Sequence, residues 1–270
     1  MFPTPHIPHP TPVWLIGGTQ ESAQLAIALL QAHIPCVITV TTETARSLYP
    51  HDPLLQIWVG RLNEDSLRSF IHQHHICAIL DASHPFAVEI SQLAIAMAER
   101  FQLPYLRYER GVGCGVQGVE TNEVRVESFE ALLATNLLEN QRVLLTIGYR
   151  PFALFKPWQE RTTLFARILP SAIALQSALE SGFTPDRLIA IRPPISAELE
   201  QSLWHQWHIS MVVTKASGAP GGEDIKREIA RELGVKLVVV DRPAIAYPQQ
   251  TSDVAIALSF CQEHGTRQIA

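Results

Sequence analysis

Apolar runs rich in valine, isoleucine and leucine alternate with helix-like segments along almost the whole of this 270-residue chain. The run at Val13–Ile16 is followed by apolar residues that recur at helical spacing from Ala23 to Leu30, and a second run begins at Cys36. Strands separated by helices pair in parallel, and those helices bury a parallel sheet on both faces. The alternation therefore predicts an α/β fold with mainly parallel sheets.

The number of strands predicts two lobes. About ten runs have the character of strands, which is more than one doubly wound sheet usually contains. We divide the chain into a flexible, proline-rich extension at 1–12, an N-terminal Rossmann-like lobe at 13–140 and a C-terminal Rossmann-like lobe at 141–270. Ligands of such sheets bind beyond the carboxyl ends of the strands, so we expect the glycine turns of both lobes to open onto a cleft between them.

The charge and the cysteines exclude several classes of protein. A net charge of -5 argues against a nucleic-acid-binding surface, so an anionic ligand has to be met by local groups of arginine and lysine. No C-x-x-C pair occurs among Cys36, Cys77, Cys114 and Cys261, and neither a metal site nor a disulfide framework is expected. Without a membrane-spanning apolar run or a hydrophobic signal core, we expect a cytoplasmic protein that binds no membrane.

A glycine-rich loop connects a predicted strand at Met211–Lys215 to a predicted helix that begins at Glu223. Glycines at such a junction leave backbone N–H groups uncovered, and the helix N-terminus adds a partial positive charge. The loop is not a P-loop, because no Gly-Lys-Ser/Thr follows the glycines. It predicts an anion cradle, with a tight turn and solvated lysines as the alternative. The candidate residues are Lys215, Ser217, Gly218, Gly221, Gly222 and Lys226.

A second glycine turn follows the first strand and reads Gly17-Gly18-Thr19-x-Glu21. It opens a βαβ unit of the kind that binds dinucleotides, although the full G-x-G-x-x-G spacing is absent. Arg46 lies beyond the next strand, where an arginine can meet a ribose 2′-phosphate and so favour NADP over NAD. A surface arginine on a loop is the alternative.

Polar residues also follow the predicted strand at residues 76–80. Asp81, Ser83 and His84 stand just beyond its carboxyl end, where a parallel sheet presents side chains to a ligand. These groups can bind, orient or transfer a proton. The alternative is that Asp81 and Ser83 cap the following helix and His84 has no part in chemistry.

Together these strings resemble the precorrin-6A reductases of cobalamin (vitamin B12) biosynthesis. The likeness covers about Val13 to Pro243 and its motifs occur in the family's order. The strings that carry it are Gly17-Gly-Thr-x-Glu21, Asp81-Ala-Ser-His-Pro-Phe-Ala87, Leu144-Leu-Thr-x-Gly148, Val213-Thr-Lys-x-Ser-Gly218-x-x-Gly-Gly222-x-x-x-Lys226 and Val239-x-x-Arg-Pro243.

The resemblance implies an enzyme that uses NADPH to reduce one double bond of the precorrin-6A macrocycle, or of its cobalt form, to the 6B product. Its partner would be this tetrapyrrole substrate, and transient contact with neighbouring pathway enzymes is a further expectation. His84 and Lys215 are then candidate proton donors. The coenzyme would be held by Gly17, Gly18, Thr19, Glu21, Arg46 and Ser83. The substrate would be held by Asp81, Gly148, Tyr149, Arg150, Arg192, Ser217, Gly218, Gly221, Gly222 and Lys226.

One loop departs from the family's pattern, which has Gly-Pro-Phe-Ser followed shortly by Asn. This chain has Arg192-Pro-Pro-Ile-Ser196, and then Glu198, Glu200 and Gln201. The departure keeps open a non-catalytic sensor that binds a nucleotide or a tetrapyrrole. A further alternative is an NADP-dependent reductase of another small molecule, although the Tyr-x-x-x-Lys pair of short-chain reductases is absent.

Overall fold

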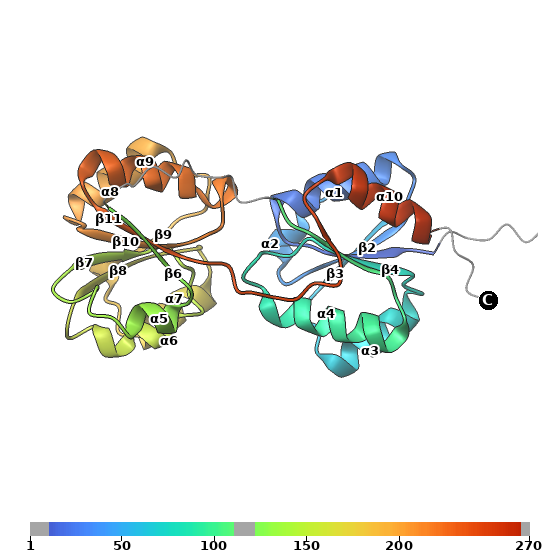
Figure 1. Ribbon diagram of the computed structural model, residues 1–270, viewed down its shortest axis with the longest axis horizontal. Coiled ribbons are helices and arrows are strands. Elements are labelled where there is room, and N and C mark those ends of the chain that lie inside the picture. The colour runs from blue at the N-terminus through green and yellow to red at the C-terminus, as the bar shows by residue number, and fades with distance from the viewer. Residues whose placement is uncertain (1–10, 111–121, 266–270) are drawn as a thin grey trace, which may run out of the picture. The chain divides into compact units, whose positions relative to one another are not determined.

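The computed structural model describes residues 11–110 and 122–265, which form two compact units (Figure 1). The first unit contains the described residues up to 110 together with 244–265, and the second contains 122–243. Residues 1–10 of the predicted extension, and Cys114, lie outside the described residues. No helix among the described residues is both long and apolar enough to cross a bilayer.

The first unit is built on a six-stranded sheet in the order β12-β5-β4-β1-β2-β3, and all of its strand pairs are parallel. The chain adds β2 and β3 on one side of β1 and then β4, β5 and β12 on the other. The order of strands therefore reverses between β1 and β4. Ligands bind at such a reversal point in doubly wound sheets. The strands are β1 (Val13–Ile16), β2 (Cys36–Val40), β3 (Leu55–Val59), β4 (Ala78–Asp81), β5 (Tyr105–Tyr108) and β12 (Gln250–Thr251).

Helices cover both faces of this sheet, with α1 and α10 on one side and α3 and α4 on the other (Figure 1). Alternate residues of β1 serve the two sides, since Val13 and Leu15 belong to one apolar cluster and Trp14 and Ile16 to another. This explains why the strand is apolar without interruption. The helices are α1 (Gln20–Gln31), α2 (Glu43–Arg46), α3 (Glu64–Gln73), α4 (Val88–Phe101) and α10 (Val254–Gly265).

The second unit repeats this design with a parallel sheet in the order β6-β11-β10-β7-β8-β9. Its order of strands reverses between β7 and β10. The strands are β6 (Glu123–Val126), β7 (Arg142–Leu145), β8 (Thr163–Ile168), β9 (Leu188–Ala190), β10 (Met211–Lys215) and β11 (Lys236–Val240).

Helices α8 and α9 cover one face of the second sheet, and α5, α6 and α7 cover the other (Figure 1). Under α8 and α9 the core is formed by Trp204, Ile229 and the strand residues Val212 and Leu237. The helices are α5 (Phe129–Leu133), α6 (Phe152–Phe155), α7 (Ala172–Glu180), α8 (Ala197–Gln206) and α9 (Glu223–Leu233), with 3₁₀ turns η1 (Lys156–Trp158), η2 (Pro185–Arg187) and η3 (Ala219–Gly221).

The parallel α/β class predicted from the sequence is confirmed, but the chain divides differently from the expected boundary at residue 140. Strand β6 pairs with β11 of the second sheet, and the C-terminal β12 returns to pair with β5 of the first. Both are edge strands whose partners are distant in sequence, so local periodicity does not indicate which sheet they join. Neither β3 nor β12 was among the predicted strands.

Candidate active site

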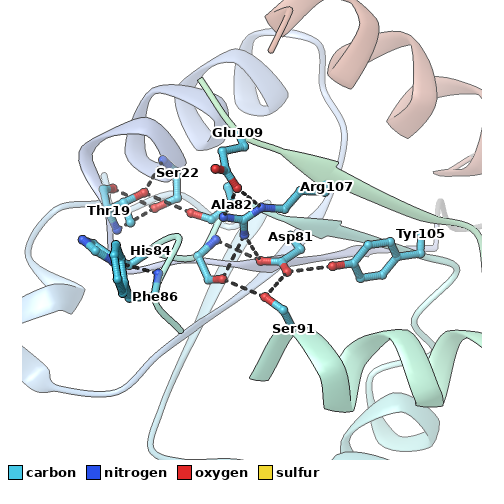
Figure 2. Close-up of polar contacts among 11 residues, drawn as sticks. Thr19, Ser22, Asp81, Ala82, His84, Phe86, Ser91, Tyr105, Arg107 and Glu109 are labelled. Carbon is cyan, nitrogen blue, oxygen red and sulfur yellow. Dashed lines mark hydrogen bonds and ion pairs between the residues drawn. The ribbon is translucent and has the colours of Figure 1, made fainter. Parts of the chain in front are cut away.

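At the reversal point of the first sheet, the turn after β1 lies against the loop after β4 (Figure 2). Ile16 is in register with Asp81, and the amide of Ala82 donates to the carbonyl of Ile16 at 3.1 Å. The Thr19 hydroxyl donates to the carbonyl of Ala82 at 3.1 Å. The structure thus brings together the Gly17–Thr19 turn and the 81–84 loop, two of the predicted site segments.

Thr19 also forms the N-cap of α1. Its hydroxyl accepts the amide of Ser22 at 3.0 Å, while the Ser22 hydroxyl accepts the amide of Thr19 at 3.0 Å. This capping box leaves the first-turn amides of Gln20 and Glu21 without an acceptor among the described residues. Those two N–H groups, with the partial positive charge of a twelve-residue helix, suit an anion such as a diphosphate.

The two glycines of this turn have different surroundings. A Cβ on Gly17 would lie 2.3 Å from the hydroxyl oxygen of Tyr49, so only glycine fits there. Gly18 has a φ of +100° and nothing within 4 Å of the place a Cβ would occupy. Its amide donates to the Tyr49 hydroxyl at 2.7 Å. Gly17 therefore admits the tyrosine, and Gly18 keeps open space beside the N-terminus of α1.

Asp81, predicted to contact the substrate, is completely buried instead. One carboxylate oxygen accepts the amide of Ser83 at 3.0 Å and Arg107 Nη1 at 2.9 Å. The other accepts the hydroxyls of Ser91 at 2.6 Å and Tyr105 at 2.7 Å (Figure 2). Four donors satisfy this carboxylate, so its role is to fix the loop after β4 rather than to touch a ligand.

Arg107 completes this buried group from β5. Its side chain is 1% exposed and bridges two carboxylates. Nη1 donates to Asp81, while Nε and Nη2 both donate to Oε2 of Glu109, at 3.0 and 2.8 Å. Burial raises the pKa of the Tyr105 phenol, with the charge of Asp81 adding to the effect, which keeps the phenol protonated as a donor. The cation and its carboxylates compensate one another in an environment where an unpaired charge is costly.

Ser83 and His84 follow Asp81 but face different surroundings. Ser83 is 4% exposed, and its hydroxyl accepts Arg107 Nη1 at 3.1 Å, so it belongs to the buried group. His84 is exposed, and its Nδ1 accepts the amide of Phe86 at 3.2 Å. With Nδ1 as the acceptor, the neutral imidazole carries its proton on Nε2. Figure 2 shows His84 and Phe86 pointing away from Asp81.

Arg46 lies at the end of α2, beyond the carboxyl end of β2. Its guanidinium is half exposed and 3.7 Å from Glu43, one turn earlier. Such an exposed pair holds the side chain weakly, so Arg46 can reorient toward a phosphate. Whether Arg46 contacts the adenosine ribose stays a prediction.

The reversal point of the second sheet carries Gly148, Tyr149 and Arg150 after β7, and Lys215 at the end of β10. Lys215 is half-buried, and its ammonium lies 5.7 Å from the centre of the Phe129 ring. Burial, and secondarily the charge of Arg150, lowers the pKa of Lys215 to about 8. A lysine with this pKa is partly deprotonated just above neutral pH and can serve as an acid.

The loop after β10 proves to be closed on itself, which differs from the predicted cradle of uncovered amides. The Gly218 amide donates to the Glu223 carboxylate at 2.7 Å, Gly221 to the Gly218 carbonyl at 3.0 Å, and Gly222 to the Ala219 carbonyl at 2.8 Å. A Cβ on Gly221 would lie 1.8 Å from Ser217 Oγ, so the glycine is required for close packing. The loop supplies its own anion, the carboxylate of Glu223.

Lys226, expected to meet substrate carboxylates, is 2% exposed and points into the same loop. Its ammonium donates to the carbonyls of Gly221 at 2.8 Å and Gly222 at 3.1 Å. Burial and then the charge of Arg167 lower the pKa of Lys226 to about 8. The lysine therefore fixes the loop from inside. Of the side chains predicted to bind a ligand from this loop, those of Lys215 and Ser217 remain partly exposed.

The loop that departs from the family's pattern begins where β9 ends. Arg192 is exposed there, and Ser196 caps α8 by accepting the amide of Leu199 at 3.3 Å. Glu200 is buried and paired with Arg167. Part of the departing sequence thus serves the packing of α8, and Arg192 is the side chain left for a ligand.

Sequence reasoning missed Tyr49, Arg107 and Phe129. Arg107 stands between Leu106 and Tyr108 in a predicted strand, and a charge in such a run signals a buried ion pair. Tyr49 and Phe129 gave no such signal, because each reaches its site through a tertiary contact. In the part of the chain that is described, no cluster of His, Cys, Asp and Glu side chains could hold a metal ion.

Comparison with known proteins agrees with this geometry. The family model described as precorrin-6x reductase CbiJ/CobK matches residues 12–262. A cobalt-precorrin-6A reductase of Synechocystis sp. is 44% identical over 93% of this chain and 96% of its own length. Another from Priestia megaterium is 31% identical over 87% and 92%. The solved CobK precorrin-6A reductase shares the fold, with a TM-score of 0.75 at 23% identity over 94% of this chain and 97% of its own. The chain therefore belongs to the precorrin-6x reductase CbiJ/CobK family.

Proposed function

We propose that this chain reduces one ring double bond of cobalt-precorrin-6A to give the 6B form, with NADPH as the reductant. The relatives from Synechocystis sp. and Priestia megaterium are cobalt-precorrin-6A reductases, which favours the cobalt-containing substrate over precorrin-6A itself. The observation that carries the proposal is that each sheet has, at its reversal point, groups whose chemistry suits an anionic ligand. The first has a helix N-terminus with open space, and the second has a cationic pair.

The first unit fits a dinucleotide. The amides of Gln20 and Glu21 would bind its diphosphate at the N-terminus of α1, and Gly18 leaves the room needed for close approach. Arg46 would bind the ribose 2′-phosphate that distinguishes NADPH from NADH. Thr19 and Ser83 shape this surface without donating to the ligand. The Thr19 hydroxyl donates to the carbonyl of Ala82, and the Ser83 hydroxyl donates to Ser91 Oγ at 3.4 Å, because the Ser91 proton already goes to Asp81. The coenzyme, when bound, supplies the hydride.

The second unit fits an anionic substrate. The macrocycle carries acetate and propionate carboxylates, and the Arg150 guanidinium would bind one of them by charge-assisted hydrogen bonds. Arg192, Tyr149 and the Ser217 hydroxyl stand near the same strand ends as further candidates. The Lys215 ammonium would give a proton to the ring carbon next to the one that accepts the hydride, and would regain it from solvent. His84, on the first unit, is the second candidate donor.

The test is to mix the purified chain with NADPH and either cobalt-precorrin-6A or precorrin-6A, and to follow the absorbance of both reactants. The proposal predicts loss of the NADPH band only when a macrocycle is present, and faster loss with the cobalt form. Binding of NADPH with no oxidation in either mixture would contradict it and would favour a sensor.

A further inference from the structure

The hydroxyl of Tyr49 makes two hydrogen bonds and belongs to a chain of three that all run in one direction. The Gly18 amide donates to it at 2.7 Å, and it lies 2.7 Å from Ser22 Oγ. The Ser22 hydroxyl donates its only proton to the carbonyl of Thr19 at 2.7 Å. Tyr49 must therefore donate to Ser22 while it accepts from Gly18, since each hydroxyl has one proton. The phenol closes the glycine turn into a single bonded ring.

The side chain of Tyr49 is buried beside the glycine turn. Its side chain is 4% exposed, and Gly17 presents no Cβ where the phenol oxygen lies. Burial raises the pKa of the phenol, so it stays protonated and keeps its role as donor to Ser22. A group this enclosed is not displaced by a ligand at the surface. It sets the shape of the turn before a ligand arrives.

The same residue holds the segment that carries Arg46. The amide of Tyr49 donates to the Arg46 carbonyl at 3.2 Å, directly after α2. Through the side chain of Tyr49, which is 31 residues from Gly18, the segment after α2 is tied to the glycine turn. The proposed diphosphate site and the proposed 2′-phosphate site are thereby held at a fixed distance.

We infer that Tyr49 is a positioning residue for the coenzyme, which holds the Gly18 turn and the Arg46 segment in the arrangement that binds NADPH. The inference rests on the proposed function, because it assumes that the coenzyme lies at the first unit. Tyr49 takes no part in the chemistry, so its loss weakens NADPH binding and leaves kcat nearly unchanged.

The test is the Kd for NADPH, measured by titrating coenzyme fluorescence in the absence of any macrocycle. Tyr49→Phe removes one hydroxyl and two hydrogen bonds, and we expect a Kd about tenfold higher. Tyr108→Phe is the matched control. It removes a hydroxyl from another tyrosine of the first unit that is 5% exposed, and this hydroxyl makes no hydrogen bond among the described residues. Its Kd should equal that of the unaltered chain.

The outcomes separate this inference from the proposed function. If Tyr49→Phe binds NADPH as tightly as the unaltered chain, the positioning role is wrong even if the melting temperature falls, and the proposed function stands. If the unaltered chain binds no NADPH, both are wrong. Should Tyr49→Phe fail to fold, Ser22→Ala removes the acceptor of the same phenol and is judged by the same two results.

Discussion

The ammonium group of Lys215 lies 5.7 Å from the centre of the Phe129 ring, at the strand ends where the second sheet reverses its order. The aromatic face favours the cation, whereas burial and the charge of Arg150 oppose it. The balance lowers the pKa of Lys215 to about 8, within the range in which a lysine can exchange protons near neutral pH. Two predictions follow from the chemistry of this group.

Lys215 should produce the alkaline limb of the pH profile. An acid acts in its protonated form, and Lys215 loses that form as the pH rises through about 8. We expect kcat/KM to be flat just below this value and to fall tenfold per pH unit above it. Lys215→Arg keeps the charge but cannot release a proton in this range, so kcat should drop about 100-fold and the limb should disappear. The control is Lys156→Arg, on an exposed turn, and an unchanged limb in Lys215→Arg would exclude Lys215 as the acid.

Replacing Arg150 by glutamine should change two quantities together. The substrate KM should rise about tenfold, since one charge-assisted hydrogen bond to a carboxylate is lost. The alkaline limb of kcat/KM should also move to higher pH, because a positive charge that disfavours protonated Lys215 has been removed. The move is partial, since burial is the larger cause. A higher KM with no movement of the limb would show that Arg150 does not act on Lys215.

Arg46→Ala should reduce the preference for NADPH over NADH about tenfold, because the 2′-phosphate would lose its charge-assisted hydrogen bonds. Binding of NADH should hardly change. The measurement is the Kd of each coenzyme, and Arg68→Ala on the exposed face of α3 serves as the control. Equal losses for both coenzymes would place Arg46 away from the 2′-phosphate.

The buried group around Arg107 should dominate the stability of the first unit. Arg107→Met would leave the completely buried Asp81 without its cation, and we expect it to lower the free energy of unfolding by about 3–5 kcal/mol. Arg100→Met breaks an exposed pair with Glu64 and should cost less than about 1 kcal/mol. Denaturant unfolding of both variants compares the two, and similar costs would contradict the structural role assigned to Arg107.

Gly221→Ala should destabilise the second unit by about 1–3 kcal/mol, because the new methyl group would overlap Ser217. A Ser217→Gly background removes the overlapping side chain and should recover most of that loss. The melting temperatures of the single and double variants test this. No recovery in the double variant would mean that the two positions are not packed together.

Much of the fold was predictable because its signals are local. Helix α9 begins at the predicted Glu223, directly after Gly222. The sheet that each edge strand joins was not predictable. Strand β6 joins the second sheet by pairing with β11, and β12 joins the first by pairing with β5, and both partners are distant in sequence.

The sequence predicts which polar residues follow the strands, but it does not predict what those residues contact. The strand ends carry the expected residues, yet Asp81 and Lys226 are buried and bonded within the protein. A sequence shows that a polar residue follows a strand, but not whether a partner such as Arg107 or the Gly221 carbonyl already satisfies it. Tyr49 could not be predicted as part of the site, because it contacts Gly18 across 31 residues of sequence and only the fold brings the two together.

The most direct test of the proposed reduction is to follow the hydrogens. Cobalt-precorrin-6A should be incubated with the chain and NADPH that carries deuterium at the transferred position, and the product examined by mass spectrometry. The account predicts one deuterium from the coenzyme and one hydrogen from solvent in each product molecule. A macrocycle of unchanged mass, recovered from a mixture in which NADPH is bound, would contradict it.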